Sequence, residues 1–357
     1  MPTTGDKGSM NDDTQGGLLG PDGFARPHIG FRALADVDLR DARIRSGPFV
    51  LPPALARARL KRWQHFCVLS RGSLITLAVV DSAYLKLAWC QVVDLATGER
   101  FEHKRQRPLA DTAVARSLWD DRTWFRAAGF HLRIHSHLAA RRHVIEFDID
   151  ASDDGPEVHG TLTCDHDPET IDSMVVSLPV GRDRYFYSHK LPVPVSGAVT
   201  IGDEERTFDP REAVAILDVH KGHYPRHTWW RWATCAGRDA DGRLIGINLT
   251  KNVVRDDDVW NENVVWVDGR ATRLGPAVFD FDRDERMEPW RLSTADGKVV
   301  LEFHPQGDRG ENIDIPGVVR SRFHQLYGTF SGSVRAGDQD VTFTDVWGLC
   351  EDHDAVW

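Results

Sequence analysis

The residues best suited to chemistry gather in one stretch, Asp218 to Trp232, which reads DVHKGHYPRHTWWRW. After its opening carboxylate come imidazoles, cations and indoles: His220, Lys221, His223, Arg226, His227, Trp229, Trp230, Arg231 and Trp232. Charged and imidazole groups are costly to bury without partners, whereas tryptophan is mostly apolar surface with one N–H to satisfy. The mixture indicates a polar cluster in the wall of an apolar small-molecule pocket. The alternative is a strand with alternating faces followed by a polar turn.

Asp218 and His220 form the candidate proton-handling pair of this stretch. Residues two apart in an extended strand share one face, so both side chains point the same way. A carboxyl group buried in apolar surroundings can stay protonated at neutral pH and act as an acid. The alternative is a structural ion pair of Asp218 with Lys221 or Arg226, which needs no catalytic role.

A second segment, YFYSHK from Tyr185 to Lys190, carries titratable groups in a strand-like context. Alternation places Tyr185, Tyr187 and His189 on one face, and the intervening side chains on the other. A face of two tyrosines and a histidine could line a cavity and supply a proton donor. An ordinary half-buried strand with one polar edge explains the same pattern.

The elements that must position these residues are predicted to be almost entirely strands. Alternation or β-branched enrichment between turn signals occurs in FHLRIHSHL, HVIEFDID, VHGTLTC, RLIGINLT, VVWVDG, KVVLEFHP and DVTFTDVWG. Asp-Gly and related turns separate them, at 96–98, 241–242, 268–269, 296–297 and 336–338. Many short strands joined by such turns favour an antiparallel sandwich or barrel. Helices are predicted only over residues 52–63 and, more weakly, over residues 109–125.

The chain is long enough for two β units. We expect a flexible N-terminal tail over residues 1–25, an N-terminal domain over 26–205 and a C-terminal domain over 206–357. The Pro- and Gly-rich piece from Pro192 to Gly202 is predicted to be the crossover between them.

Composition excludes several classes of function. The formal net charge of −10 argues against general affinity for nucleic acid or for an anionic membrane surface. We expect no transmembrane helix, no signal peptide and a cytoplasmic location. The five cysteines are odd in number and contain no CxxC, which indicates buried thiols rather than disulfides or a zinc module. Nucleotide-binding glycine motifs and a GxSxG elbow are absent, so we assign no cofactor and no metal.

The block ILDVHKGHYPRHTWWRWATCAG, followed by RLIGINLTKN, ENVVWVDG and FHPQGDRGENI, resembles the bacterial DUF2804 family. That family is in turn distantly similar to the lipocalin-like carotenoid hydratases and AttH-type proteins. The resemblance implies two consecutive lipocalin-like antiparallel β-barrels, with a few short helices, and no established activity. In the hydratases, a Leu-Asp step opens the second half and its Asp is thought to protonate an alkene. Leu217-Asp218 matches this step.

The segment from Tyr187 to His189 matches the aromatic, His-bearing strand that precedes the step in those relatives. Two features depart from the hydratase pattern: Ile216 replaces a Tyr found two residues before the Asp in some hydratases, and HKGHYP replaces the sequence after it. Both departures put hydration chemistry in question.

We therefore predict a cofactor-independent lyase or isomerase, hydratase- or cyclase-like, acting on an apolar terpenoid- or polyketide-like molecule. Asp218 would be the proton donor, and His189 and His220 would tune or relay the proton. The substrate would be bound by six side chains: Tyr187, Lys221, Arg226, Trp229, Trp230 and Trp232. The alternatives are a non-catalytic carrier of a lipid or other apolar metabolite and, third, a scaffold whose cavities are filled by side chains. The sequence does not determine the oligomeric state.

Overall fold

A computed structural model describes residues 17–31, 36–108, 110–317 and 319–356, and within them antiparallel strands dominate. The first sheet contains β1 (His28–Gly30), β4 (Lys61–Leu69), β5 (Ser73–Asp81), β6 (Lys86–Asp94), β7 (Arg100–Arg107), β8 (Asp111–Ala113), β9 (Asp121–Ala127), β10 (Phe130–His137), β11 (Arg142–Ile149), β12 (Val158–Asp165), β13 (Met174–Gly181), β14 (Arg184–Ile201), β15 (Glu204–Phe208) and β16 (Val214–Gly222).

The second sheet has the order β20-β19-β18-β17-β25-β24-β23-β22-β21. Its strands are β17 (His227–Arg238), β18 (Leu244–Asn252), β19 (Val264–Val267), β20 (Arg270–Arg273), β21 (Ala277–Asp280), β22 (Trp290–Thr294), β23 (Val299–Ile315), β24 (Val319–Ala336) and β25 (Gln339–Val356). A small hairpin, β2 (Arg45–Ser46) with β3 (Phe49–Val50), and the short helices α1 (Pro53–Ala58), η1 (Leu39–Asp41) and η2 (Leu138–Ala140) complete the described elements.

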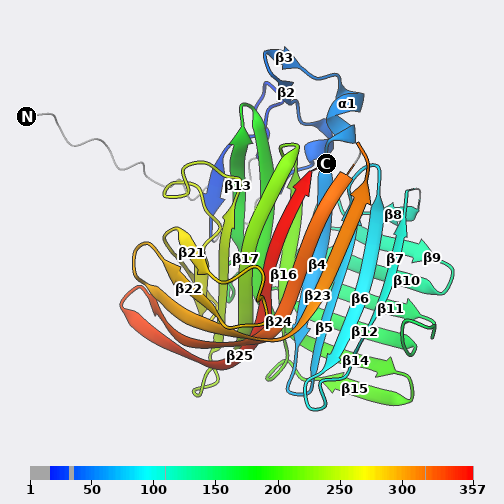
Figure 1. Ribbon diagram of the computed structural model, residues 1–357, viewed down its shortest axis with the longest axis vertical. Helices are drawn as coiled ribbons and strands as arrows, with labels where there is room; N and C mark the ends of the chain where they lie inside the picture. The colour runs from blue at the N-terminus through cyan, green and yellow to red at the C-terminus, as the bar shows by residue number, and fades with distance from the viewer. Residues whose placement is uncertain (1–16, 32–35, 109, 318, 357) are drawn as a thin grey trace, which may run out of the picture.

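The two sheets are both curled and lie against each other (Figure 1). The red and orange strands β25 and β24 cross in front of β4 and β16, and β25 contacts β4 directly. Apolar side chains from both sheets join one core, in which Trp232 and Tyr327 pack with the interior of the first sheet. A second apolar cluster, including Trp290 and Phe303, fills the curl of the second sheet. The predicted all-β architecture of two lipocalin-like antiparallel units is confirmed.

The predicted crossover from Pro192 to Gly202 is wrong, because these residues lie almost entirely inside the 18-residue strand β14. Pro192 and Pro194 have extended backbone in this strand and still pair in register with Ile216 and Val214. The strand β16 also pairs with β4, so it belongs to the first sheet. The chain changes sheet between Gly222 and His227, after the residue 206 at which a second unit was predicted to begin.

The helix predictions are correct in part. α1 begins as expected, with proline at its first turn, but it ends at Ala58 because Lys61 already starts β4. The helix predicted over residues 109–125 is wrong, apart from residue 109, which lies outside the described residues. Its span contains β8 and the start of β9, which pair with each other, and β9 also pairs with β10. Long-range pairing overrides the local helical pattern here.

Local chain features elsewhere agree with the sequence in most places. Asp268 and Gly269 both have positive φ, at 51° and 76°, and form the tight turn between β19 and β20. All five cysteines are buried and free, as predicted. Of the predicted tail, residues 1–16 lie outside the described residues, whereas Leu18 and Phe24 are buried against the body of the protein. Among the described residues, no helix is long and apolar enough to cross a membrane.

Candidate active site between the two sheets

A pocket of about 160 Å³ lies between the facing sheets. One wall comes from β4, β5, β6, β14 and β16 of the first sheet, and the other from β17, β18, β23, β24 and β25 of the second. Most of the wall is apolar, and much of it is aromatic, including Trp63, Trp89, Trp230, Trp232 and Phe323. A cavity of this kind, with a few polar groups converging on it, is the usual form of a small-molecule site.

Strand register explains how the first wall is built. Lys190, Asp218 and His65 are direct neighbours across β14, β16 and β4. One step along the same face, His220 stands between Ser188 and Trp63. Because side chains two apart share a face, both rows project toward the pocket.

The second wall repeats this arrangement. Trp232, Glu351 and Gln325 are neighbours across β17, β25 and β24, and Arg309 on β23 follows Gln325. The adjacent row on this face places Trp230 beside His353 and Phe323. The pocket is therefore built from residues more than 280 positions apart in the chain: strand register aligns them within each sheet, and the packing of the two sheets brings the two walls together.

Asp218 lies at the centre of a buried polar group. Its Oδ2 accepts a hydrogen bond from Trp63 Nε1 at 3.2 Å, and its Oδ1 lies 3.1 Å from His220 Nε2 and 3.4 Å from Lys190 Nζ. Burial opposes ionisation of the carboxyl, but the charges of Lys190 and His220 outweigh burial and hold its pKa well below the ordinary value. Asp218 is thus a carboxylate, and the premise of a protonated Asp218 is not met.

Lys190 is the cation that the sequence prediction missed. It is buried, its Nζ lies 3.3 Å from Glu262 Oε2 as well as near Asp218, and it sits 4.7 Å from the ring centroid of Trp232. Burial alone would lower the pKa of Lys190. The negative charges of Asp218 and Glu262 raise it by more than burial lowers it, so the pKa lies above the ordinary lysine value. The predicted ion-pair partners of Asp218, Lys221 and Arg226, are replaced by this residue.

Glu351 has the opposite electrostatic character to Asp218. Burial raises its pKa to about 7, although Trp230 Nε1 and Gln325 Nε2 donate hydrogen bonds to its two oxygens at 2.8 and 2.7 Å. The nearby charge of Asp218 raises the pKa further. At neutral pH a large share of Glu351 is therefore protonated, while Asp218 is ionised.

Stacked rings hold the imidazole of His220. The Trp63 ring lies parallel to it with centroids 4.6 Å apart, and Phe186 stacks with its centroid at 5.5 Å. His220 Nδ1 and Tyr224 OH are 2.9 Å apart. Trp63 also stacks with Trp230 of the other wall at 5.8 Å, so the aromatic surface continues from one sheet to the other.

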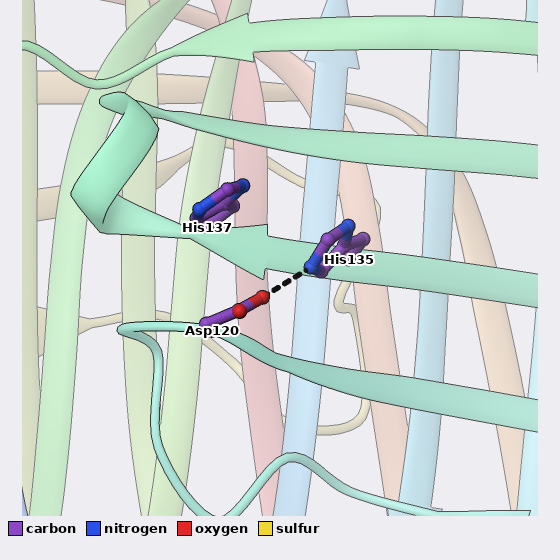
Figure 2. A group of neighbouring side chains, drawn as sticks. All are labelled: Asp120, His135 and His137. Carbon is purple, nitrogen blue, oxygen red and sulfur yellow. Dashed lines mark hydrogen bonds and ion pairs between the residues drawn. The ribbon is translucent and has the colours of Figure 1, made fainter.

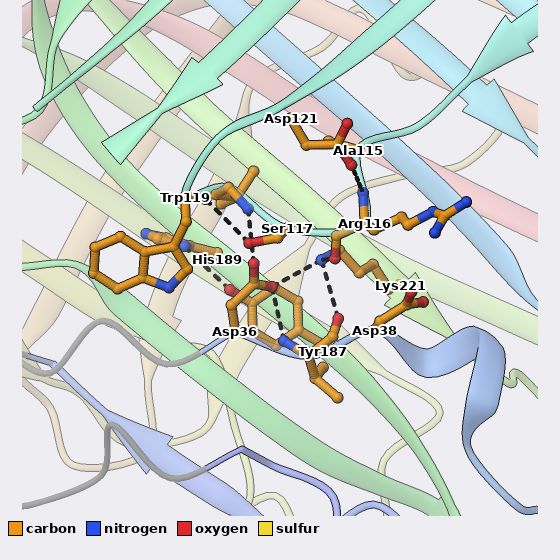
Figure 3. Close-up of polar contacts among 12 residues, drawn as sticks. Asp36, Asp38, Ala115, Arg116, Ser117, Trp119, Asp121, Tyr187, His189 and Lys221 are labelled. Carbon is orange, nitrogen blue, oxygen red and sulfur yellow. Dashed lines mark hydrogen bonds and ion pairs between the residues drawn. The ribbon is translucent and has the colours of Figure 1, made fainter. Parts of the chain in front are cut away.

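Three predicted site residues lie on the opposite face of the first sheet (Figure 3). Lys221 Nζ donates to Asp36 Oδ1 at 2.8 Å and to the carbonyl of Arg116 at 2.6 Å. Tyr187 OH and His189 Nδ1 are 3.2 Å apart on that same inner face. The prediction that Tyr187 and His189 share one face of their strand, β14, is confirmed. The expectation that they share the pocket with Asp218 is wrong. The pocket face carries Lys190 and its alternate neighbours.

The remaining predicted residues divide between the pocket and the surface. Asp218, His220, Trp229, Trp230 and Trp232 all border the pocket. Arg226 is exposed and is not among the residues that line it.

Sequence reasoning did not place Trp63, His65, Lys190, Arg309, Glu351 and His353 in the site, although all of them line the pocket. Glu351 and His353 did leave a signal, because two titratable residues separated by one position follow an apolar segment near the C-terminus. Lys190 also left a signal, because it is a cation that points to the face of its strand opposite His189. Neither signal identifies the partner strand, which only the register supplies.

Within the part of the chain that the structure describes, two groups of side chains could hold a metal ion, and both lie outside this pocket. In one, His135 Nε2 lies 2.7 Å from Asp120 Oδ1, and the His135 and His137 rings stack with centroids 5.3 Å apart (Figure 2). The other consists of Asp148, Asp150 and His159. Neither group contributes to the chemistry of the pocket.

Comparison with known proteins agrees with this architecture. The profile of a family described as a domain of unknown function (DUF2804) matches residues 12–357. The crystal structure of CghA with Sch210972 has a TM-score of 0.56 and 11% identity, covering 95% of this chain and 97% of that chain. At this identity the likeness shows a common fold. No curated protein sequence matches the chain.

Two further solved structures are less similar. Kievitone hydratase from Nectria haematococca has a TM-score of 0.48 and 11% identity, covering 83% of this chain and 88% of that chain. A putative AttH from Nitrosomonas europaea has a TM-score of 0.39 and 14% identity, covering 82% and 92% respectively.

Proposed function

The chain belongs to the DUF2804 family, whose description assigns no activity, and from that premise we propose that it is a cofactor-independent lyase or isomerase, hydratase- or cyclase-like. Its substrate is an apolar small molecule bound between the two sheets, and its chemistry is acid–base catalysis. The observation that carries this proposal is a pair of carboxyl groups in one aromatic pocket whose pKa values are pushed apart. Glu351 titrates near 7, whereas Asp218 stays ionised. Such a separation assigns acid and base roles.

Glu351 is the proposed proton donor. Its pKa of about 7 matches neutral pH, where an acid transfers protons most effectively. Trp230 and Gln325 hold the carboxyl group in place by donating hydrogen bonds to its two oxygens. Because both neighbours are donors, neither of them uses the acidic O–H of Glu351. The proton is therefore available to a ligand in the pocket.

Asp218 and His220 are the proposed acceptor pair. In a hydration, Glu351 gives a proton to one carbon of a C=C bond, water forms a bond to the other carbon, and the water gives its second proton to this pair. Overall, one H and one OH add across the double bond, and a proton returns to Glu351 through pocket water. Lys190 holds the Asp218 carboxylate in place. Trp63 and Trp230, which stack on each other, add aromatic surface to the wall that a flat ligand would contact.

The test is a product search with purified protein and a panel of apolar alkenes and unsaturated ketones in H₂¹⁸O and in D₂O. Mass spectrometry distinguishes hydration, which adds ¹⁸O, from isomerisation or cyclisation, which rearranges the skeleton without adding oxygen. Glu351→Gln keeps the size of the side chain and removes its transferable proton. We expect its rate to fall about 10²–10⁴-fold, the usual contribution of a positioned acid. Equal rates for parent and variant would eliminate Glu351 as the acid.

A carrier of an apolar metabolite is the second candidate function. Its supporting observation is that Lys190 already forms ion pairs with both Asp218 and Glu262 in a buried group, which a binding pocket needs only for structure. Native mass spectrometry of protein from its source tests this reading. A co-purified apolar ligand, together with no turnover of that ligand, supports the carrier over the enzyme.

A further inference from the structure

One part of the pocket wall carries buried hydrogen-bond donors that the protein leaves unused. Trp89 Nε1, Arg309 Nη1 and both ring nitrogens of His65 have no hydrogen-bond partner among the residues that the structure describes. All three side chains line the pocket, and they are 7%, 4% and 3% exposed, respectively. Buried polar atoms are nearly always paired, because each unpaired one forfeits its bonds to water. Four such atoms, on three side chains that line one cavity, therefore require an explanation.

These three side chains form one continuous group, which we name the donor patch. The Arg309 guanidinium lies 4.2 Å from the Trp89 ring centroid, and the Trp89 and His65 rings are 6.1 Å apart. Arg309 comes from β23 of the second sheet, whereas Trp89 and His65 come from β6 and β4 of the first. The donor patch thus exists only where the two sheets meet.

Glu102 fixes the direction of the Arg309 donors. Its Oε1 accepts from Arg309 Nε at 2.8 Å and lies 2.7 Å from Nη2. A planar guanidinium held on this edge leaves Nη1 at a set position. Glu102 is not among the lining residues, so the carboxylate anchors the guanidinium from behind the pocket wall.

His65 adds a neutral group to this patch. Burial lowers its pKa to about 4, so at neutral pH the ring has one N–H donor and one bare acceptor nitrogen. The patch therefore offers a ligand N–H groups from an indole, a guanidinium and an imidazole. Only an oxygen or nitrogen acceptor with lone pairs complements such a set.

The charge of the pocket selects among oxygen acceptors. The lining carries the carboxylates of Asp218, Glu262 and Glu311 as well as cations, and Lys190 and Arg309 are already ion-paired with Asp218, Glu262 and Glu102. A neutral carbonyl oxygen accepts the hydrogen bonds of the donor patch without bringing a further charge into this paired set. The remaining wall is apolar and aromatic, which suits a conjugated hydrocarbon body.

We propose that the donor patch of His65, Trp89 and Arg309 binds the carbonyl oxygen of an α,β-unsaturated ketone. This inference rests on the proposed function because it names the substrate class of the same pocket. Hydrogen bonds to the carbonyl draw electron density away from the conjugated C=C bond and make its β-carbon electrophilic. They also stabilise the negative charge that develops on the carbonyl oxygen when water adds to the β-carbon. The proton from Glu351 then completes the addition at the α-carbon.

Three small probes of equal skeleton test the ligand class. Benzylideneacetone carries the ketone, (E)-1-phenyl-1-butene lacks the oxygen, and cinnamate carries a carboxylate. Isothermal titration at pH 7.5 should give a dissociation constant for benzylideneacetone at least about tenfold lower than for either other probe, as expected for more than one added hydrogen bond. Equal affinity of the ketone and the hydrocarbon would overturn the proposal, as would tighter binding of cinnamate or no binding of the ketone.

Trp89→Phe tests the patch itself. Because Trp89 Nε1 has no partner within the described protein, this change removes a donor without breaking a protein hydrogen bond. We expect about fivefold weaker binding of benzylideneacetone and unchanged binding of the hydrocarbon. The infrared carbonyl stretch of the bound ketone should also move toward its value in apolar solvent. Trp119→Phe, at an exposed tryptophan outside the pocket, is the matched control and should change neither result.

Arg309→Met provides the second arm, since it removes the strongest donor and keeps an unbranched, flexible side chain. A variant that folds and still shifts the carbonyl stretch as the parent does would refute the patch. These measurements need binding and no turnover. If the donor patch does not bind the ketone, the Glu351→Gln rate test can still be carried out. If the protein shows no turnover, the binding measurements can still be interpreted.

Discussion

Replacing Glu351 by glutamine should change how the stability of the protein depends on pH. Glu351 is buried, and its pKa rises to about 7 from an ordinary value of 4.5. Glutamine has nearly the same shape and can still accept from Trp230 or Gln325 through its one carbonyl oxygen, but it does not titrate. The difference between parent and variant therefore isolates the titration of one carboxyl group.

The sign follows from where the proton binds more tightly. Below pH 4.5 the carboxyl is protonated in both the folded and the unfolded chain, and its full contribution to stability is present. Between pH 4.5 and 7 the unfolded chain loses this proton while the folded protein keeps it, so stability falls as the pH rises. At 1.36 kcal/mol per pH unit, the interval from 4.5 to about 7 corresponds to about 3 kcal/mol.

Urea unfolding of both proteins from pH 4.5 to pH 8.5 measures this difference. The free energy of unfolding of the parent should drop relative to Glu351→Gln by most of that 3 kcal/mol, and level off above pH 7. Glu205→Gln, at an exposed strand position, is the matched control and should run parallel to the parent. Parallel curves for Glu351→Gln would refute the assignment of a neutral buried Glu351.

Three further results are expected. Lys190→Met leaves the buried carboxylates of Asp218 and Glu262 without their cation, so urea unfolding should show a loss of about 3–5 kcal/mol; a loss below about 1 kcal/mol would mean that the pair is not desolvated. Trp63→Phe keeps a ring against His220 but removes the N–H that Asp218 accepts, and should lower the free energy of unfolding by about 2 kcal/mol; no change would show that water replaces this bond freely. For any substrate found, kcat/KM should fall about tenfold per pH unit above pH 7, because the neutral form of Glu351 reacts; a profile that stays flat to pH 9 would contradict this.

Sequence patterns predicted the fold because they depend on local chemistry. Period-two alternation and turns such as Asp268-Gly269 need no knowledge of distant residues. The Pro-rich strand β14 was misread for the same reason. Pro192 and Pro194 suggest a break when read locally, yet the register of β14 with β16 continues through both.

The site was predictable only as far as one strand determines it. Asp218 and His220 share a face by alternation alone, and this expectation is met. The same rule places Lys221 on the other face, so the cation of Asp218 had to come from a neighbouring strand. Lys190 supplies it because β14 pairs with β16 in a register that no local pattern specifies. Glu351 and Arg309 come from the second sheet and reach the site only because the two sheets pack against each other.

The proposed chemistry depends on a neutral carboxyl group, Glu351, that stands in the pocket with an ionised one, Asp218. Infrared difference spectroscopy between the parent protein and Glu351→Gln tests it most directly, since it requires no substrate. The carbonyl stretch of a protonated carboxyl should appear in the parent at pH 6, vanish by pH 8.5 with a midpoint near 7, and be missing from the variant. A carboxylate signal from Glu351 already present in full at pH 6 would contradict the claim and leave the pocket without its acid.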